Sequence, residues 1–149
     1  MTKEVLITIS GLQIMDEEGS EPVEVITAGE YYYRNGKHYI LYDEVMEGFE
    51  GVTKNRIRIT QDCLDVSKKG VSNVHMIFEK NRKNLTSYQT PFGNLLIGID
   101  ARNLQISEEE NMIDIKVDYD LEVNYEPLAE CSLTMNIRSK EAEGFSLSS

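Results

Sequence analysis

The stretch from residue 112 to residue 125 alternates between apolar and polar side chains without a break. Its apolar members are Ile113, Ile115, Val117, Tyr119, Leu121, Val123 and Tyr125, and its polar members are Asp114, Lys116, Asp118, Asp120, Glu122 and Asn124. Because side chains two residues apart share one face of a strand, the pattern predicts a long, half-buried β-strand. At about 3.3 Å per residue it would extend roughly 45 Å, and strands of that length are typical of strongly coiled sheets or closed barrels.

Shorter patterns of the same kind follow one another along the chain, giving roughly ten strand candidates with no amphipathic helix between them. Without crossover helices, consecutive strands pair antiparallel. The first candidate runs from about Lys3 to Met15, and Pro22 opens the second. Before the long strand we expect a polar connection at residues 108–111, and after it a turn at Glu126-Pro127. The dipeptide Asn35-Gly36 is a strong hairpin signal, because both central residues of a type I′ turn need a positive φ. Gly11, Gly29 and Gly98 lie inside strand patterns, where glycine permits the bends that closing a barrel requires.

These patterns predict an all-β fold, a single antiparallel up-and-down β-barrel of about 8 to 10 strands. We expect the barrel domain to span residues 1–138. Residues 139–149 are small and polar, so we expect them to form a flexible C-terminal tail.

The composition indicates one globular domain without a membrane segment. The chain has 149 residues, of which 40% are hydrophobic and 28% charged. No apolar run approaches the roughly 20 residues of a membrane helix, and the N-terminus lacks the form of a secretory signal. Cys63 and Cys131 make no evident disulfide framework. We therefore expect a cytoplasmic protein that does not enter a membrane.

Charge is distributed unevenly over the chain. The formal net charge is -11, yet residues 54–83 hold eight basic groups against three acidic ones. The overall acidity argues against nucleic-acid binding. The basic segment could attract an anionic ligand, an acidic protein partner or another copy of the chain, and the alternative is an ordinary solvated surface.

The sequence carries no recognisable catalytic, metal or cofactor motif. His38 and His75 are isolated and lack the spacing of zinc ligands. A phosphate-binding glycine loop, a dinucleotide fingerprint and a serine nucleophile elbow are all missing from the sequence. The acids between 114 and 122 lie about 7 Å apart along a strand, which favours a solvated face over a calcium site. We therefore predict no catalytic residue, metal or cofactor. The sequence favours a protein that is not an enzyme but leaves the question open.

Several segments are similar to those of a known family. They are Met76-Ile77-Phe78-Glu79-Lys80, Tyr88-Gln89-Thr90-Pro91-Phe92-Gly93, Ile97-Gly98-Ile99 and Tyr39-Ile40-Leu41-Tyr42-Asp43-Glu44. Together they resemble the uncharacterised bacterial YwiB-like family, from about Thr2 to Ile137. The resemblance implies a lipocalin-like, or calycin-type, β-barrel in the cytoplasm, and it implies no particular activity.

Tyrosines are the most informative candidate ligand contacts, because each combines an apolar ring with one polar group. Arg56 and Arg58 share one strand face; they could line a polar lumen with Glu30 or Glu44, but Ile57 and Ile59 opposite them favour the outside. The candidate ligand-binding residues are Tyr31, Tyr33, Tyr42, Arg56, Arg58, Tyr88, Thr90 and Phe92.

Two functions remain open. The first is non-enzymatic binding of a small molecule in the barrel mouth, near the Asn35-Gly36 hairpin and the turn at Thr90. The alternative is a protein-interaction or homo-oligomeric assembly module that uses a basic surface from residues 54–83.

Overall fold

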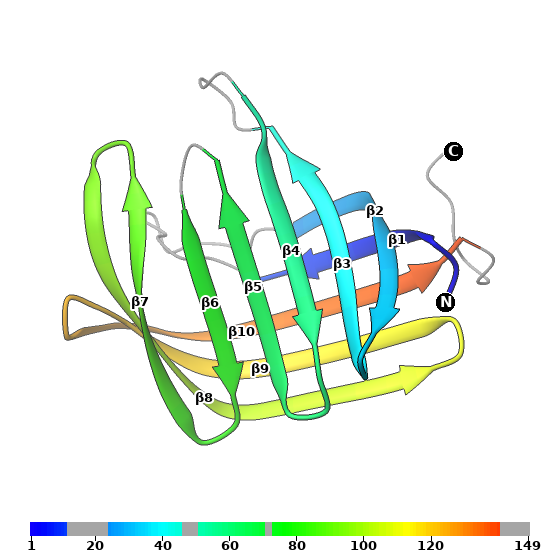
Figure 1. Cartoon of the computed structure of the whole chain (residues 1–149). Coiled ribbons are helices and arrows are strands. Elements are labelled where there is room, and N and C mark those ends of the chain that lie inside the picture. Colours follow the sequence, from blue (N-terminus) through cyan, green and yellow to red (C-terminus); the bar gives the residue numbers. More distant parts are fainter. Residues whose placement is uncertain (12–23, 46–50, 71–72, 141–149) are drawn as a thin grey trace.

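The computed structural model describes residues 1–11, 24–45, 51–70 and 73–140, and this part of the chain is built of β-strands and turns (Figure 1). The strands are β1 (Glu4–Ser10), β2 (Glu24–Arg34), β3 (Lys37–Glu44), β4 (Thr53–Ile59), β5 (Cys63–Lys69), β6 (Val74–Glu79), β7 (Arg82–Thr90), β8 (Gly93–Glu109), β9 (Met112–Val123) and β10 (Glu126–Ser139). Within these residues there is no helix that could span a membrane.

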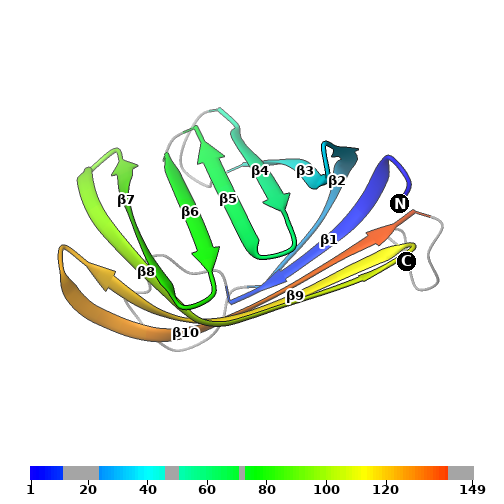
Figure 2. The ribbon, with the colours of Figure 1, turned by 60° about the horizontal axis from the view of Figure 1, so that its bottom comes forward.

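The ten strands close into one antiparallel barrel. Each strand pairs with its sequence neighbours, and β1 pairs with β10 to complete the circle. In Figure 2, β8, β9 and β10 form one wall, and β4, β5 and β6 form the opposite wall. The predicted all-β barrel is thus confirmed. Closing the sheet gives the first and last strands a partner, so no strand of the described part is left with an unpaired edge.

Apolar side chains from every second strand position fill the middle of the barrel. Across neighbouring strands, Ile40 lies opposite Ile57, Ile57 opposite Val66, and Val66 opposite Met76, all buried. Phe78 and Tyr119 meet from opposite walls with ring centroids 5.0 Å apart and an interplanar angle of 73°. Burying each such side chain stabilises the fold by about 1.5–3 kcal/mol, so the central layers serve packing.

The long strand predicted at residues 112–125 is shorter than expected and has a longer neighbour. β9 ends at Val123, because Asn124 and Tyr125 both have positive φ and form the turn. Glu126 and Pro127, which the pattern placed in that turn, instead begin β10. The longest strand is β8, which continues through the polar residues up to Glu109 that looked like a connection.

The turn at Asn35-Gly36 is as predicted, with φ of 53° and 77° at its two central residues. β10 ends at Ser139, the first residue of the expected tail, and Ser139 is buried. Residues 141–149 of that tail, the predicted strand end after Gly11 and the predicted strand start at Pro22 lie outside the described residues.

Candidate ligand-binding site

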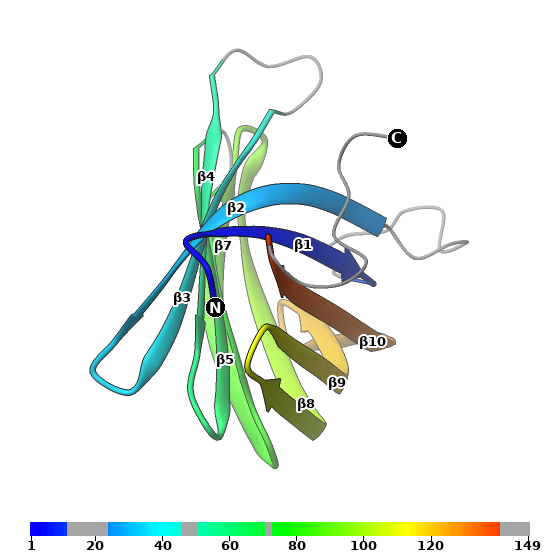
Figure 3. The same ribbon diagram turned by 90° about the vertical axis from the view of Figure 1, so that its right-hand side faces the viewer.

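Strand β2 leaves β3 halfway along its length. From Glu30 to Arg34 it pairs with β3, whereas from Glu24 to Glu30 it follows β1. Figure 3 shows β2 curving away from β3 and β4. Gly29 lies at the bend, where an added Cβ would lie 2.5 Å from Ile7 Cδ1 and 2.8 Å from the carbonyl oxygen of Leu41. β2 therefore turns this corner at a position that leaves no room for a side chain.

The divergence opens a groove of about 580 Å³ at the end of the barrel where β3 ends and β4 begins. We call it the mouth groove, and its lining residues are Ala28, Gly29, Glu30, Leu41, Tyr42, Asp43, Lys54, Asn55, Arg56 and Lys69. Both inward-facing and outward-facing positions line it, as expected for an opening between two strands. Its volume lies in the range of small-molecule pockets.

Positive charge in the mouth groove is only partly neutralised. Lys54 lies 3.6 Å from Asp43, and both side chains are largely exposed. Arg56 and Lys69 have no ion-pair partner among the described residues. The lining holds three cations against the two carboxylates of Asp43 and Glu30, and Arg56 lies opposite Leu41 in the β3–β4 ladder. This excess of positive charge near an apolar side chain is suited to an anion with an apolar body.

A polar cluster faces inward behind the groove. Lys68 Nζ lies 2.8 Å from Asn55 Oδ1 and 3.3 Å from Glu44 Oε1, and the Asn55 side chain is buried. The hydroxyl of Thr53 is also buried and has no hydrogen-bond partner within the described ranges. We call Glu44, Asn55 and Lys68 the mouth cluster. Burial raises the pKa of the neighbouring Tyr42 phenol, and the Glu44 carboxylate raises it further.

The opposite end of the barrel is tied by a chain of three side chains. Tyr31 on β2 donates its hydroxyl proton to Nδ1 of His38 on β3 at 2.7 Å, and Nε2 of His38 donates to Glu108 on β8 at 2.8 Å. This assignment uses the neutral imidazole with its proton on Nε2. The rings of Tyr33 and His38 pack edge to face with their centroids 5.1 Å apart, yet Tyr33 is 60% exposed. We call Tyr31, His38 and Glu108 the latch.

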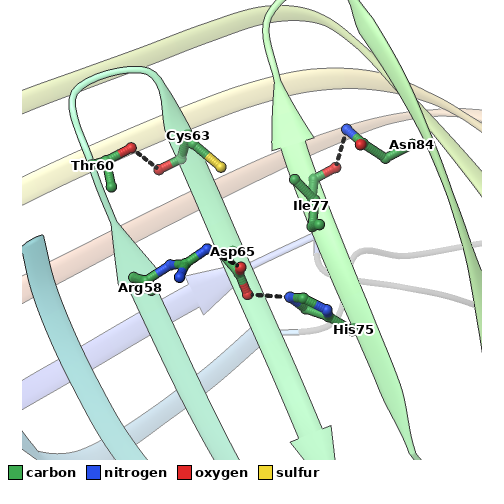
Figure 4. Close-up of polar contacts among 7 residues, drawn as sticks. All are labelled: Arg58, Thr60, Cys63, Asp65, His75, Ile77 and Asn84. Atoms are coloured by element: carbon green, nitrogen blue, oxygen red, sulfur yellow. Dashed lines mark hydrogen bonds and ion pairs between the residues drawn. The ribbon is translucent and has the colours of Figure 1, made fainter.

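The outer surface of β4, β5 and β6 carries a second polar cluster (Figure 4). The Asp65 carboxylate is buried and accepts hydrogen bonds from Nη2 of Arg58 at 2.7 Å and from Nε2 of His75 at 2.6 Å. Because one buried carboxylate holds both groups, Arg58 and His75 are fixed on an otherwise solvated face. We call these three residues the outer cluster.

Arg56 and Arg58 face outward, the orientation that the sequence favoured. Ile57 and Ile59, which alternate with them, are fully buried in the core. Lys68 differs from the other basic groups of residues 54–83 because it points into the barrel, where it joins the mouth cluster. The basic surface is therefore smaller than the basic segment.

Three further candidate residues lie on β7 and in the turn that joins it to β8. The Thr90 hydroxyl donates to the Gly93 carbonyl at 2.8 Å and accepts from the Phe92 backbone N–H at 3.1 Å. Phe92 is 90% exposed. Tyr88 is half-buried and packs against the core. Thr90 thus stabilises the turn, and Phe92 projects from it.

The structure therefore divides the eight candidate residues instead of gathering them. Tyr42 and Arg56 line the mouth groove. Tyr31 and Tyr33 lie at the latch end, close to the β2–β3 turn. Tyr42 lies near the opposite end of β3. Arg58 belongs to the outer cluster; Tyr88, Thr90 and Phe92 belong to the β7–β8 hairpin.

Side chains suited to metal binding or nucleophilic chemistry are not concentrated at the groove. Within the described residues no group of three or more His, Cys, Asp or Glu side chains is placed to hold a metal ion. Burial raises the pKa of the Cys63 and Cys131 thiols, which keeps both protonated near neutral pH.

Sequence reasoning missed the mouth cluster, although a signal for it was present. Asn55 continues the inward phase of Ile57 and Ile59, and Lys68 continues the inward phase of Val66. A polar residue in the apolar phase of a strand is the pattern that marks a buried polar group. Glu44 gave no such signal, because the alternation of its strand is apolar on both faces.

The described part of the chain is therefore a closed ten-stranded antiparallel barrel with an open groove where β2 leaves β3. Over residues 7–135 the chain matches the family described as a domain of unknown function, DUF1934, and it belongs to that family.

A curated relative and a solved structure agree with this assignment. The chain is 25% identical over 127 residues to the uncharacterized beta-barrel protein YwiB of Bacillus subtilis (strain 168), covering 85% of this chain and 88% of the relative. It is also similar to the crystal structure of the ywiB protein from Bacillus subtilis, with a TM-score of 0.76, 19% identity and 92% of each chain covered. The predicted resemblance to the YwiB-like family is confirmed, and the lipocalin-like form is consistent with the closed barrel.

Proposed function

We propose that this protein binds a small anionic molecule with an apolar body in the mouth groove, without catalysing a reaction on it. The observation that carries the proposal is the divergence of β2 from β3, which leaves a groove of about 580 Å³ containing two unpartnered cations, Arg56 and Lys69, within the described residues. An anionic group would contact these two side chains, and the apolar body would cover Leu41.

The mouth cluster supports this site from the inner side. Tyr42 and Asn55 belong both to the lining of the groove and to the inward row beside Lys68. The ion pair and hydrogen bond of Lys68 hold the ends of β3, β4 and β5 together. The groove wall is therefore preorganised, which lowers the entropic cost of binding.

The test uses 8-anilinonaphthalene-1-sulfonate, a fluorescent probe with an anionic group and an apolar body. We expect the Arg56→Gln and Lys69→Gln double variant to bind the probe about tenfold more weakly, equivalent to roughly 1.4 kcal/mol. Arg34→Gln with Lys80→Gln is the matched control, because it removes the same charges from exposed positions outside the groove lining. Equal weakening in both double variants would mean general surface attraction and would reject the groove.

A further variant compares the groove with the β7–β8 hairpin, where the sequence also placed candidate residues. Phe92→Ser removes an exposed aromatic ring without touching the mouth groove. We expect its probe affinity to equal that of the unmodified protein. Loss of binding in Phe92→Ser with full binding in the groove variant would move the site to that turn.

A further inference from the structure

The wall formed by β8, β9 and β10 carries like charges opposite one another. Asp100, Asp120 and Glu130 lie in one row across the three strands, with Asp100 paired to Asp120 and Asp120 to Glu130. Arg102 Nε lies 3.2 Å from Asp120 Oδ1, and Lys83, which lies opposite Asp100 in the β7–β8 ladder, forms its ion pair with Glu122. Asp100 and Glu130 therefore have no ion-pair partner among the described residues. Like charges directly opposite each other destabilise a sheet, so this row favours contact with an external cation.

The same wall has a concave apolar contact area beside the row. A pocket of about 450 Å³ has Asp100, Asp120, Glu130 and Leu128 in its lining, together with the ion pair of Lys83 and Glu122. Carboxylates thus outnumber the one cation in the lining four to one. Leu128 is 50% exposed. We call this surface the acidic wall. An exposed apolar side chain surrounded by charges is the composition of an interface centre with a polar rim.

The wall formed by β4, β5 and β6 shows the opposite charge. Lys54 and Lys69 lie directly opposite each other in the β4–β5 ladder, which is again a like-charge pair. Arg56 lies one outward position further along β4. The outer cluster fixes Arg58 and His75 next to them. We call this surface the basic wall; it presents cations without full neutralisation, as the acidic wall presents carboxylates.

The two walls cannot contact each other within one molecule, because they face outward on opposite sides of the barrel (Figure 2). Their unbalanced charges can meet only between two copies, with the basic wall of one copy facing the acidic wall of the next. Such a contact joins two different surfaces, so it is heterologous, and it generates a ring or an open chain.

We propose that copies of this protein associate head-to-tail through these two walls. The partner is a second copy of the chain, and charge complementarity between the walls is the argument. The formal net charge of -11 opposes association at long range. At physiological ionic strength the Debye length is about 8 Å, so contacts between the walls outweigh the screened repulsion of the whole molecules. This inference goes beyond ligand binding in the mouth groove and stands on the register and charges of the two walls.

The test reverses the charge of each wall in a separate variant. Arg56→Glu with Lys69→Glu makes both walls acidic, and Asp100→Lys with Glu130→Lys makes both walls basic. We expect the unmodified protein to self-associate at 0.1 M salt and to dissociate at 1 M salt in sedimentation velocity. Each variant alone should be monomeric, because its two walls repel each other. A mixture of the two variants should associate again, at least tenfold more tightly than either alone.

Matched controls separate this contact from general charge effects. Arg34→Glu with Lys80→Glu, and Glu24→Lys with Glu109→Lys, change the net charge equally at exposed positions outside the lining of either wall pocket. We expect both controls to associate like the unmodified protein. Each double reversal changes the formal charge of -11 by four, so both wall variants stay negative and have no general attraction for each other.

Three outcomes would overturn the proposal. The unmodified protein could be monomeric at low salt, a wall variant could associate on its own as strongly as the unmodified protein, or the mixture could stay monomeric while both variants show native circular dichroism. Probe binding is also measured at 0.1 M salt on Asp100→Lys with Glu130→Lys, which should be monomeric and leaves the lining of the mouth groove unchanged. Failure of self-association therefore leaves the groove proposal standing, and loss of probe binding leaves the wall contact standing.

Discussion

The two ends of the barrel are stabilised by different kinds of contact. The latch joins β3 to β8, which are separated in the barrel order by β2, β1, β10 and β9 on one side. The mouth cluster joins only β3, β4 and β5, which already neighbour one another in the sheet. The latch therefore fixes the width of its end, while the mouth cluster stiffens one part of the rim.

This difference explains where the groove occurs. At the latch end, Tyr31 holds β2 against β3 through His38, and the β2–β3 ladder is intact there. At the mouth end the ladder has stopped and no described side chain ties β2 to β3 across the opening. One end of the barrel is thus held closed by side chains that connect its strands, and the other end stays open where such contacts between β2 and β3 are missing from the described residues.

The largest expected effect comes from the bend that starts the groove. Gly29→Val places side-chain atoms against Ile7 and the Leu41 backbone, and we expect the free energy of unfolding to fall by about 3 kcal/mol. Ala28→Val is the control, because Ala28 is the adjacent residue and faces outward. It should change the unfolding free energy by less than about 0.5 kcal/mol. Urea unfolding measures both. Equal stability of the two variants would show that β2 does not depend on a glycine at this corner.

The mouth cluster is tested by Lys68→Met. This change keeps an unbranched, flexible side chain but removes the ammonium group that contacts Glu44 and the buried Asn55, and we expect a loss of about 2 kcal/mol in unfolding free energy. Lys69→Met, one residue on and facing outward, should be close to neutral. If the two variants were equally stable, the inward cluster would contribute nothing to the mouth end.

The latch is tested by Tyr31→Phe. Losing the phenol leaves Nδ1 of the half-buried His38 without its donor, so we expect the unfolding free energy to fall by about 1.5 kcal/mol. Tyr33→Phe is the matched control, because its ring contacts His38 while its side chain is largely exposed. A Tyr31→Phe protein as stable as the control would reduce the latch to a packing contact.

Alkaline pH gives the smallest effect for each group, and it compares both ends in one experiment. Burial raises the pKa of Tyr31 and of Tyr42 in the folded protein, whereas in the unfolded chain a tyrosine titrates near about 10. Above that pH the unfolded state has lost protons that the folded state keeps, so stability falls as pH rises towards the folded pKa. Each such tyrosine contributes at most about 1.4 kcal/mol per pH unit. In Tyr42→Phe the unfolding free energy should fall less steeply with pH. If urea unfolding between pH 9 and pH 11 gave the same pH dependence for this variant and the unmodified protein, the raised pKa of Tyr42 would be contradicted.

The sequence predicted the barrel well because barrel closure follows from local patterns. Alternation assigned the inward residues of β4, such as Ile57 and Ile59, and the Asn35-Gly36 turn set the register of its hairpin. The end of β9 was misplaced because a positive φ at Tyr125 is an uncommon choice that no composition rule anticipates. Glu126-Pro127 resembled a turn, yet proline is tolerated at a strand start.

The candidate site was harder to predict, because it depends on which residues meet across the barrel. The tyrosines of β2 and β3 were expected to share one mouth, but Tyr31 and Tyr42 lie at opposite ends of these strands. The groove arises where β2 changes its partner from β3 to β1, and a strand pattern gives no sign of such a change. The latch also joins residues 70 positions apart, which alternation does not relate to each other.

The pairing of β1 with β10 has a consequence for how the chain folds. The other ladders join strands that follow one another in the sequence, so they can form by successive hairpin closure on short loops. The β1–β10 ladder, in which Ile7 lies opposite Ile137, must instead close a loop of almost the whole chain. The entropy lost in closing this loop is offset only by contacts with neighbouring hairpins that have already formed. We call the β1–β10 ladder the seam and expect it to form late in folding. Substitutions in the seam should therefore act mainly on the unfolding rate, and this one ladder sets the kinetic lifetime of the folded barrel.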